Sequence, residues 1–188
     1  MSLKRPFDLL IALAMLVILA LPMAIIALAI KLTSKGPILH WSRRVGRYNT
    51  FFMMPKFRSM GPGTPDVATH LLSDPHQHLT TVGRLLRLTS MDEFPQLYSI
   101  LKGDMSFVGP RPALYNQSDL IQIRTEKGVH RLQVGLTGWA QINGRDTISI
   151  ERKVELDVIY MQKRSFLFDL EIIWATFLKA AKKTGVSH

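Results

Sequence analysis

The longest feature of the hydropathy pattern is an uninterrupted apolar run near the amino terminus. Residues 9–30 contain no charged or strongly polar side chain. As a straight helix, these roughly 22 residues would extend roughly 33 Å, which is enough to cross the hydrocarbon core of a bilayer. The run is longer than the core of a secretory signal, and no convincing small-residue cleavage site precedes a polar mature start. We therefore expect a retained membrane segment.

Two paths through the membrane fit this segment. Pro22, preceded by Leu21, predicts a kink, because proline removes a backbone donor and clashes with the preceding turn. Basic residues flank both ends, so charge asymmetry does not orient a spanning helix. A helix that bends at Leu21 and Pro22 and returns would leave both ends on the cytoplasmic face, and a kinked spanning helix is the alternative. Arg5 and Asp8, at the start of the run, are expected to pair on one helical face.

Shorter patterns after the apolar run predict a small mixed domain. Two short strands, separated by a segment in which Gly46 and Asn49 favour a turn, predict a β-hairpin at residues 38–42 and 51–57. The glycine-rich segment 135–145 is predicted to be largely loop. Helical patterns occupy residues 80–88, 94–102, 119–130, 150–162 and 165–181. The fold class we expect is an α-dominated α+β domain.

The last predicted helix, at residues 165–181, is a candidate membrane-surface helix. It has broad apolar coverage, includes Trp174 and ends in lysines, which suits a helix lying at the interface. A core helix of the domain is an equally ordinary interpretation. The chain is accordingly divided into a membrane-anchoring segment at residues 1–35 and a second domain at residues 36–188.

The composition narrows the possible partners. In the 188 residues, 24 Lys and Arg face 14 Asp and Glu, which gives a formal net charge of +10. This excess suits nucleic acid, an anionic membrane surface or phosphorylated substrates, and the neighbouring apolar run favours the membrane over nucleic acid. Cysteine is absent, which excludes disulfides, a thiolate nucleophile and thiolate metal sites. The oligomeric state stays open.

Adjacent carboxylates at Asp92 and Glu93 are the strongest candidate chemistry. Ser90 and Glu93 have the spacing of a capping box, which would be a purely structural reason for the acidic pair. Arg87 and Arg111, the latter held between prolines, weaken that explanation, because arginines suit bidentate binding of phosphate oxygens. A carboxylate can attack phosphorus where arginines and a divalent cation neutralise the oxygens, and Mg²⁺ is the expected metal.

The motifs around these residues resemble a known family. The blocks MDEFPQL at 91–97 and LKGDMSFVGPRP at 101–112 are closely similar to the bacterial sugar transferases, the small monotopic polyprenol-phosphate phosphoglycosyltransferases. The similarity covers nearly the whole chain. It also includes KRPFD at 4–8, KFRSM at 56–60, GLTGWAQINGR at 135–145 and ELD at 155–157 with Tyr160.

The resemblance implies that a sugar-1-phosphate moves from a UDP-sugar to polyprenol phosphate, such as undecaprenyl phosphate, with release of UMP. It implies Asp92 as the nucleophile of a phosphosugar–aspartate intermediate and as a contact of Mg²⁺. Glu93 would be its partner and the base that deprotonates the lipid phosphate. The phosphate- and substrate-binding residues implied or expected are Arg87, Arg111, Lys56, Arg58, Asn143, Arg145 and Asp157.

Some of these residues keep other interpretations. Asp157 is either a third acid of the site or a helix residue paired with Lys153 four positions earlier. Trp139 and Tyr160 could contact a base or a sugar, or pack in the core. A basic, membrane-anchored docking module without catalysis is the alternative function, although such a module would not need the carboxylates beside the arginines.

The resemblance also implies a particular relation to the membrane. It favours a re-entrant anchor that is broken near Pro22, with interfacial amphipathic helices around a compact catalytic domain. The expected location is the cytoplasmic face of the bacterial inner membrane, in contact with membrane lipids.

Overall fold

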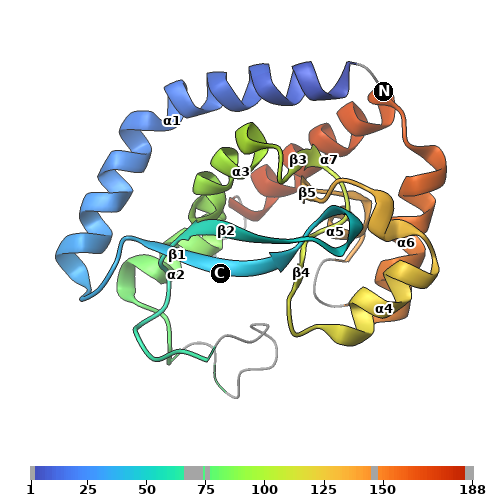
Figure 1. Cartoon of the computed structure of the whole chain (residues 1–188). Helices are drawn as coiled ribbons and strands as arrows, with labels where there is room; N and C mark the ends of the chain where they lie inside the picture. The colour runs from blue at the N-terminus through green and yellow to red at the C-terminus, as the bar shows by residue number, and fades with distance from the viewer. Residues whose placement is uncertain (1–2, 66–73, 75–76, 145–147, 185–188) are drawn as a thin grey trace.

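The structure, a computed structural model, describes residues 3–65, 74, 77–144 and 148–184. Helices surround a small sheet, so the predicted α-dominated α+β class is confirmed (Figure 1). The α-helices are α1 (Lys4–Thr33), α2 (Thr81–Thr89), α3 (Leu97–Lys102), α4 (Ser118–Glu126), α5 (Trp139–Ile142), α6 (Ile150–Lys163) and α7 (Phe166–Thr184). The strands are β1 (Leu39–Val45), β2 (Phe51–Phe57), β3 (Ser106–Val108), β4 (Ala113–Leu114) and β5 (Gly135–Thr137), and the 3₁₀ helices are η1 (Arg47–Asn49), η3 (Met91–Gln96) and η4 (Val129–Arg131).

The apolar run forms one bent helix, α1, which arches over the rest of the molecule (Figure 1). Pro22 lies inside it, where the sequence predicts a kink. Its most apolar 18-residue window has a mean hydropathy of 3.0 and is only 6% buried. By length and composition, α1 can cross a membrane, and its re-entrant path stays a prediction.

The amino-terminal end of α1 is fastened to the domain. The Arg5 guanidinium donates to the main-chain oxygens of Ile100 at 2.6 Å and Leu101 at 2.9 Å. The Asp8 carboxylate is buried and accepts a hydrogen bond from the main-chain nitrogen of Phe107 at 3.2 Å. The predicted pairing of Arg5 with Asp8 is therefore wrong, because each side chain satisfies main-chain groups of the domain instead.

The carboxyl-terminal end of α1 is fastened to the same domain. Ile30 is buried against Phe57 of β2 and Leu86 of α2. The Arg58 guanidinium donates to the main-chain oxygens of Ser34 at 2.9 Å and Lys35 at 2.7 Å. The two ends of the apolar helix thus pack on one domain. Between them, one side of the helix, with Met15 and Leu19, is partly buried against the core, whereas side chains such as Ile18 and Leu21 are exposed.

The predicted β-hairpin is confirmed. The strands β1 and β2 pair antiparallel from Leu39 opposite Phe57 to Val45 opposite Phe51. In the connecting turn, Asn49 has φ 58°, a left-handed conformation that asparagine tolerates better than most residues. The strand β4 adds to the other edge of β1 and gives the order β2-β1-β4. This small sheet supplies the wall on which the candidate site is built.

The predicted helices are confirmed with small shifts at their ends, with two exceptions. The segment 94–102 is divided between η3 and α3, and the segment 119–130 is divided between α4 and η4. The prediction that 135–145 is largely loop is wrong, because it contains β5 and α5. The strand β5 pairs in parallel with β3, with Ser106 opposite Gly135 and Val108 opposite Thr137. This pairing joins distant segments, so no local pattern announces it.

The hydrophobic core lies between the hairpin, α3, α6 and α7. Ile100, Met105 and Ile172 are among its fully buried members. Trp139 packs on Phe168 with ring centroids 5.1 Å apart, and Tyr160, which is buried, belongs to the same cluster. The packing interpretation of Trp139 and Tyr160 is therefore the one that the structure supports.

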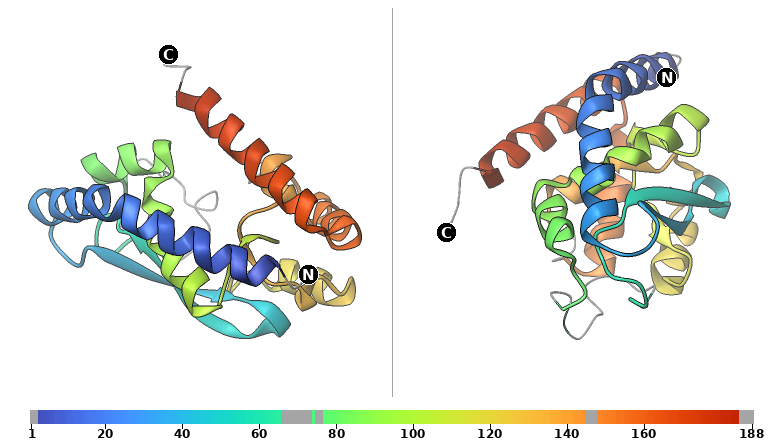
Figure 2. Two further views of the ribbon diagram at one scale, coloured as in Figure 1. Left: turned by 90° about the horizontal axis from the view of Figure 1, so that it is seen from above. Right: turned by 90° about the vertical axis from the view of Figure 1, so that its left-hand side faces the viewer.

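The helix α7 combines the two interpretations given to its sequence. Ile172 is buried in the core. Four large apolar side chains on α7 are exposed, namely Leu167, Trp174, Phe177 and Leu178. Figure 2 shows α7 extending away from the body of the molecule, with its amino-terminal end beside that of α1. One face of α7 serves the core, and an apolar face stays open to the surroundings.

Candidate active site

A tight reversal of the chain presents Asp92 and Glu93. Ser90 ends α2 in the left-handed conformation, with φ 59°, and precedes η3. Its side chain makes no capping hydrogen bond, and its main-chain oxygen accepts one from the Glu93 nitrogen at 3.2 Å. The predicted capping box is wrong, because an N-cap residue has extended backbone and Ser90 does not.

A cavity of about 360 Å³ opens beside this reversal, and we call it the Asp92 cavity. It lies between the inner face of the hairpin, the 57–65 segment, α2 and the loop that precedes β4. The cations that line it are Arg44, Lys56, Arg58, Arg87, Arg111, Arg124 and Lys153. Among the described residues, Asp92 is the only carboxylate of the lining. Such a surface suits a ligand that carries several negative charges.

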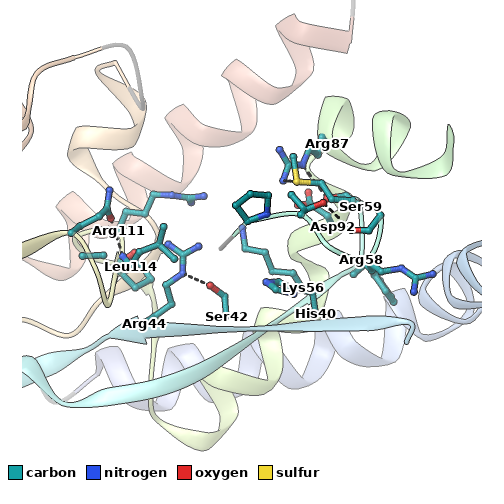
Figure 3. Close-up of a pocket in the computed structure, with 18 of the residues that line it drawn as sticks. His40, Ser42, Arg44, Lys56, Arg58, Ser59, Arg87, Asp92, Arg111 and Leu114 are labelled. Carbon is teal, nitrogen blue, oxygen red and sulfur yellow. Dashed lines mark hydrogen bonds between the residues drawn. The ribbon is translucent and has the colours of Figure 1, made fainter. Parts of the chain in front are cut away.

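Figure 3 shows how these side chains are distributed. Arg87 and Asp92 lie on one side of the cavity, Arg44 and Arg111 lie on the other, and Lys56 reaches up between them from β2. A phosphorylated ligand in the middle would therefore meet cations from several elements of the fold.

Asp92 is held in an environment that opposes its ionisation. The residue is only 8% exposed. Burial raises the pKa of its carboxyl group, and the neighbouring Glu93 charge acts in the same direction, while Lys56 and Arg87 act against them. The balance leaves the pKa above its ordinary value. An ionised Asp92 is consequently less stabilised than an exposed aspartate, which favours reaction with an electrophile.

Glu93 is held in the opposite way. Its carboxylate accepts hydrogen bonds from the Lys56 ammonium at 3.1 Å and from the Arg111 guanidinium at 2.9 Å. Burial opposes its ionisation, but Arg111 and Lys56 outweigh that effect and hold its pKa well below the usual range. Glu93 therefore stays ionised and joins β2 to the loop that carries Arg111.

Lys56 completes this arrangement from the floor of the cavity. Burial lowers the pKa of its ammonium group, and Glu93 acts in the opposite direction by stabilising the charged form. The nearby Arg111 also lowers that pKa. The positive charge of Lys56 in this cation-rich cavity thus depends on its carboxylate neighbour.

Arg87 is positioned by a close approach of α2 to the chain after β2. Its Nε donates to the Ser59 hydroxyl at 2.9 Å. At Gly83, one turn earlier, a Cβ atom would lie 1.9 Å from the main-chain oxygen of Ser59. Only glycine permits this approach, so Gly83 and Arg87 together fix α2 against the cavity wall.

The loop that carries Arg111 is held by close backbone packing at Gly109 and by a hydrogen bond from Arg124. At Gly109, a Cβ atom would lie 2.2 Å from the main-chain oxygen of Gln133, which shows how closely the two backbones pack. The Arg124 guanidinium donates to the main-chain oxygen of Arg111 at 2.7 Å. Prolines on both sides of Arg111 restrict the backbone further.

Arg124 is the functional candidate that the sequence analysis missed. Its Nε and Nη2 both donate to Asp157 Oδ2, at 3.0 and 2.7 Å. Asp157 is 2% exposed and does not line the Asp92 cavity. Asp157 thus forms its ion pair with Arg124, and Lys153 contributes only an electrostatic effect on its pKa. In the structure Asp157 thus supports Arg124, and its substrate-binding role stays a prediction.

The remaining predicted residues lie in different places. Arg58 lines the Asp92 cavity, but its guanidinium donates hydrogen bonds to Ser34 and Lys35 at the end of α1. Asn143 is exposed, does not line the cavity, and donates to the main-chain oxygen of Trp139 at 2.8 Å. Arg145 lies outside the described residues. The structure thus brings Lys56, Arg87 and Arg111 together with the carboxylates, but not Asn143.

The described residues offer few side-chain ligands for the expected Mg²⁺. The described residues contain no cluster of three or more His, Asp or Glu side chains that could hold a metal on their own. Mg²⁺ commonly keeps several waters and binds through one or two carboxylates together with substrate phosphates. A single buried carboxylate, Asp92, in a cavity suited to phosphates fits a metal that arrives with its substrate.

Comparison with known proteins gives a consistent result. The family model described as bacterial sugar transferase matches residues 1–183. An uncharacterized sugar transferase, EpsL, of Bacillus subtilis (strain 168) is 42% identical over 100% of this chain and 92% of its own length. The UDP-glucose:undecaprenyl-phosphate glucose-1-phosphate transferase of Escherichia coli (strain K12) is 37% identical over 94% of this chain.

A galactose enzyme is similar over the same region. The undecaprenyl-phosphate galactose phosphotransferase of Salmonella typhimurium is 34% identical over 97% of this chain. The chain spans 40% of the length of the Escherichia coli protein and 41% of the Salmonella protein. The match of the family model over almost every residue establishes that this chain belongs to the bacterial sugar transferase family.

Proposed function

We propose that this protein transfers a sugar-1-phosphate from a UDP-sugar to undecaprenyl phosphate through a covalent intermediate on Asp92. The observation that carries the proposal is a buried carboxylate, with a raised pKa, facing an otherwise cationic cavity. The names of the similar proteins from Escherichia coli and Salmonella supply the two substrate classes. Transfer of this kind would load the lipid carrier at the first membrane step of polysaccharide assembly.

In the first step, an Asp92 carboxylate oxygen attacks the phosphorus that bears the sugar. The bond from that phosphorus to the bridging oxygen of the diphosphate breaks, and UMP leaves with the bonding electron pair. An acyl phosphate that carries the sugar remains on Asp92. The elevated pKa favours this role, because a poorly stabilised carboxylate is the more reactive nucleophile.

The cations of the cavity make this attack possible. An anionic carboxylate is repelled by an anionic diphosphate unless fixed positive charges neutralise the phosphate oxygens. Arg87 lies on the same side of the cavity as Asp92, and Arg111 lies on the other (Figure 3). We propose that these two guanidinium groups hold the donor phosphates and the UMP leaving group.

Glu93 organises the site in this proposal. A carboxylate whose pKa is held well below the usual range is a weak proton acceptor. A phosphate monoester loses its second proton near pH 6, so the acceptor is largely dianionic at neutral pH and needs little help from a base. We therefore assign Glu93 to the positioning of Lys56 and Arg111 and do not retain it as the base.

A magnesium ion would be held by Asp92 together with phosphate oxygens of the donor. When bound, it would supply positive charge that offsets the developing charge on the diphosphate. Excess EDTA is expected to stop turnover, and an unchanged rate in EDTA would remove the metal from this proposal.

In the second step, a phosphate oxygen of undecaprenyl phosphate attacks the same phosphorus. The bond to the Asp92 oxygen breaks, which restores the free carboxylate and leaves a lipid-linked diphosphate sugar. The acceptor phosphate must therefore reach the Asp92 cavity from the membrane surface. We propose that residues 1–35 provide a re-entrant anchor and that residues 36–188 form the catalytic domain on the cytoplasmic face of the inner membrane.

The packing of α1 supports the re-entrant path. Its amino-terminal end binds α3 through Arg5, and its carboxyl-terminal end binds Arg58 beyond β2. A spanning helix would hold these ends on opposite sides of the bilayer, where one small domain could not contact both. The open apolar face of α7 would lie at the same membrane surface.

A docking module without catalysis explains less of the structure. Attraction to anionic lipids needs exposed cations, but it does not need a carboxylate buried among them, because such a carboxylate costs solvation energy. The test is a panel of UDP-sugars supplied with undecaprenyl phosphate and assayed for UMP. Repeated turnover of UMP that requires undecaprenyl phosphate is expected, after at most one equivalent released by the UDP-sugar alone, and no release with any sugar, from a folded membrane-bound protein, would favour the docking module.

A further inference from the structure

A second cavity, of about 430 Å³, lies where the two apolar helices α1 and α7 begin. We call it the Ser106 cavity. It shares no lining residue with the Asp92 cavity. Its cationic lining residues are Lys4, Arg5, Arg47, Arg131 and Arg164. These residues come from α1, η1, η4 and the junction of α6 with α7, so the fold gathers them from distant parts of the sequence.

The charges in the Ser106 cavity are unevenly balanced. Lys4 is paired with Asp169 and also donates to the main-chain oxygen of Val108 at 3.0 Å. Asp8 is the one carboxylate of the lining among the described residues, and it accepts a main-chain hydrogen bond. The arginines of the lining outnumber it, so the cavity has an excess of positive charge.

Two of the cations have their hydrogen-bonding capacity available. The side chains of Arg131 and Arg164 are exposed and make no hydrogen bond or ion pair within the described part of the chain. Arg47, in contrast, donates through Nε to the main-chain oxygen of Arg131 at 2.9 Å. A guanidinium group with free donors suits phosphate oxygens particularly well.

A buried hydroxyl group is the independent sign of a ligand. Ser106 lines this cavity and is 1% exposed, yet its Oγ has no hydrogen-bond partner. Buried polar groups are nearly always satisfied, and an unsatisfied one needs an explanation such as a missing partner. An anionic oxygen in the cavity would accept the Ser106 proton.

The position of the cavity identifies the kind of ligand. Phe7 of α1 and Phe166 of α7 are in edge-to-face contact, with ring centroids 5.2 Å apart, so the two helices begin side by side. Directly after these starts, Leu10 is 68% exposed and Leu167 is 77% exposed. Apolar side chains of this kind mark the level at which the hydrocarbon begins, and the phosphates of lipid headgroups lie just outside it.

We propose that the Ser106 cavity binds the phosphate of an anionic membrane lipid, separately from the substrates of the transfer reaction. The headgroup phosphate would accept hydrogen bonds from Arg131, Arg164 and Ser106, and the acyl chains would run along the exposed apolar sides of α1 and α7. Such a lipid would tie the amino-terminal ends of both helices to the membrane surface.

The test uses the full chain in detergent, titrated with dioctanoyl phosphatidylglycerol and followed by native mass spectrometry. The double variant Arg131→Gln/Arg164→Gln is expected to bind this lipid at least about tenfold more weakly, because two charge-assisted contacts are lost. The matched control Lys127→Gln/Lys163→Gln removes the same charge from exposed neighbours outside the cavity and is expected to bind normally. Equal affinity in the two double variants would overturn the site.

Two further measurements sharpen the result. Ser106→Ala removes a single neutral donor and is expected to weaken binding by roughly fivefold, and an unchanged affinity would remove Ser106 from the site. Inorganic phosphate is added as a competitor of the lipid. Failure to displace the lipid at millimolar concentration is expected, whereas displacement at the concentration that matches the lipid would show a site for soluble phosphate and contradict the lipid assignment.

Discussion

Asp92 and Glu93 are neighbours in the chain, but their carboxyl groups meet opposite environments. Asp92 faces the cavity, where burial raises its pKa. Glu93 does not line the cavity and is held by Lys56 and Arg111, which keep its pKa well below the usual range. Two carboxyl groups whose pKa values are pushed apart can take separate roles in one site. Here we assign reaction to Asp92 and organisation of the cations to Glu93.

The raised pKa of Asp92 predicts that Asp92→Asn makes the protein more stable at pH 7 while abolishing transfer. A folded-state pKa above the unfolded value means that stability is largest when the group is protonated and falls as pH rises through the two values. An asparagine side chain does not ionise, so the Asp92→Asn variant avoids this fall in stability as pH rises. An increase in Tm of about 2–4 °C for each kcal/mol gained is expected from differential scanning calorimetry.

The pH dependence of this difference is the control. The gain should shrink below about pH 4, where the wild-type aspartate is protonated in both states. Glu155→Gln, an exposed residue of α6, provides the matched loss of one negative charge and should leave Tm nearly unchanged. A lower Tm for Asp92→Asn at pH 7 would contradict the environment described for this carboxyl group.

For the Glu93→Gln variant we predict that activity on the alkaline side of the pH profile begins to fall at a lower pH than in the wild-type enzyme. The lowered pKa of Lys56 has burial as its main cause, and Glu93 partly offsets it. Without Glu93 the pKa falls further, so Lys56 loses its proton earlier as pH rises. We expect kcat/KM to fall at least about tenfold at pH 7, with the alkaline limb of its pH profile displaced toward neutrality.

The shape of the profile separates this account from a general base role for Glu93. Loss of a base would lower the rate without moving the alkaline limb. A profile of Glu93→Gln that is parallel to wild type across the alkaline range would therefore count against the dependence of Lys56 on Glu93.

Local elements were the part of the fold that the sequence could predict. The hairpin and most helices follow from alternation, helical periodicity and turn residues, as at Asn49 and Gly103, both of which have a left-handed backbone. Longer-range features could not be found in this way. The pairing of Ser106 with Gly135 and the bond from Arg124 to Asp157 join segments about 30 residues apart, and no local pattern encodes them.

The candidate site shows the same division. Motif similarity pointed to Asp92, Glu93, Arg87 and Arg111, which the structure does bring together. It could not tell that Asp157 pairs with Arg124, because that requires knowing which basic residue faces the acid across two helices. A lone arginine in the last turn of α4 gives no signal in a single sequence.

Arg124→Lys is predicted to weaken transfer by loosening the loop of Arg111. Lysine keeps the charge but cannot make both the fork to Asp157 and the bond to the Arg111 oxygen. We expect a loss of roughly tenfold in kcat/KM, together with a loss of stability of about 3 kcal/mol for disturbing a buried pair. The exposed pair partner Arg152→Lys should change stability by less than about 0.5 kcal/mol.

A double-mutant cycle tests whether Arg124 and Asp157 act as a unit. Arg124→Lys combined with Asp157→Asn should be little worse than either single variant, since the interaction is already broken. Additive losses in kcat/KM would instead indicate that Asp157 has a separate contact with substrate.

The re-entrant path of α1 predicts that both of its ends are accessible from one membrane face. The chain lacks cysteine, so Leu3→Cys and Lys35→Cys provide single thiols at exposed positions on either side of the helix. In sealed inverted inner-membrane vesicles, an impermeant maleimide should label both thiols. If one of the two thiols reacted only with maleimide added on the other face of the membrane, the helix would be a spanning one.

The most direct test of the central claim is the intact mass of the protein after incubation with UDP-sugar in the absence of lipid acceptor. We expect an increase equal to one sugar phosphate, localised to Asp92 by peptide mapping, with one equivalent of UMP released. Adding undecaprenyl phosphate should remove the adduct. Asp92→Asn should form no adduct. Turnover by the wild-type protein with no adduct on rapid quenching, or undiminished transfer by Asp92→Asn, would contradict a covalent intermediate on this residue.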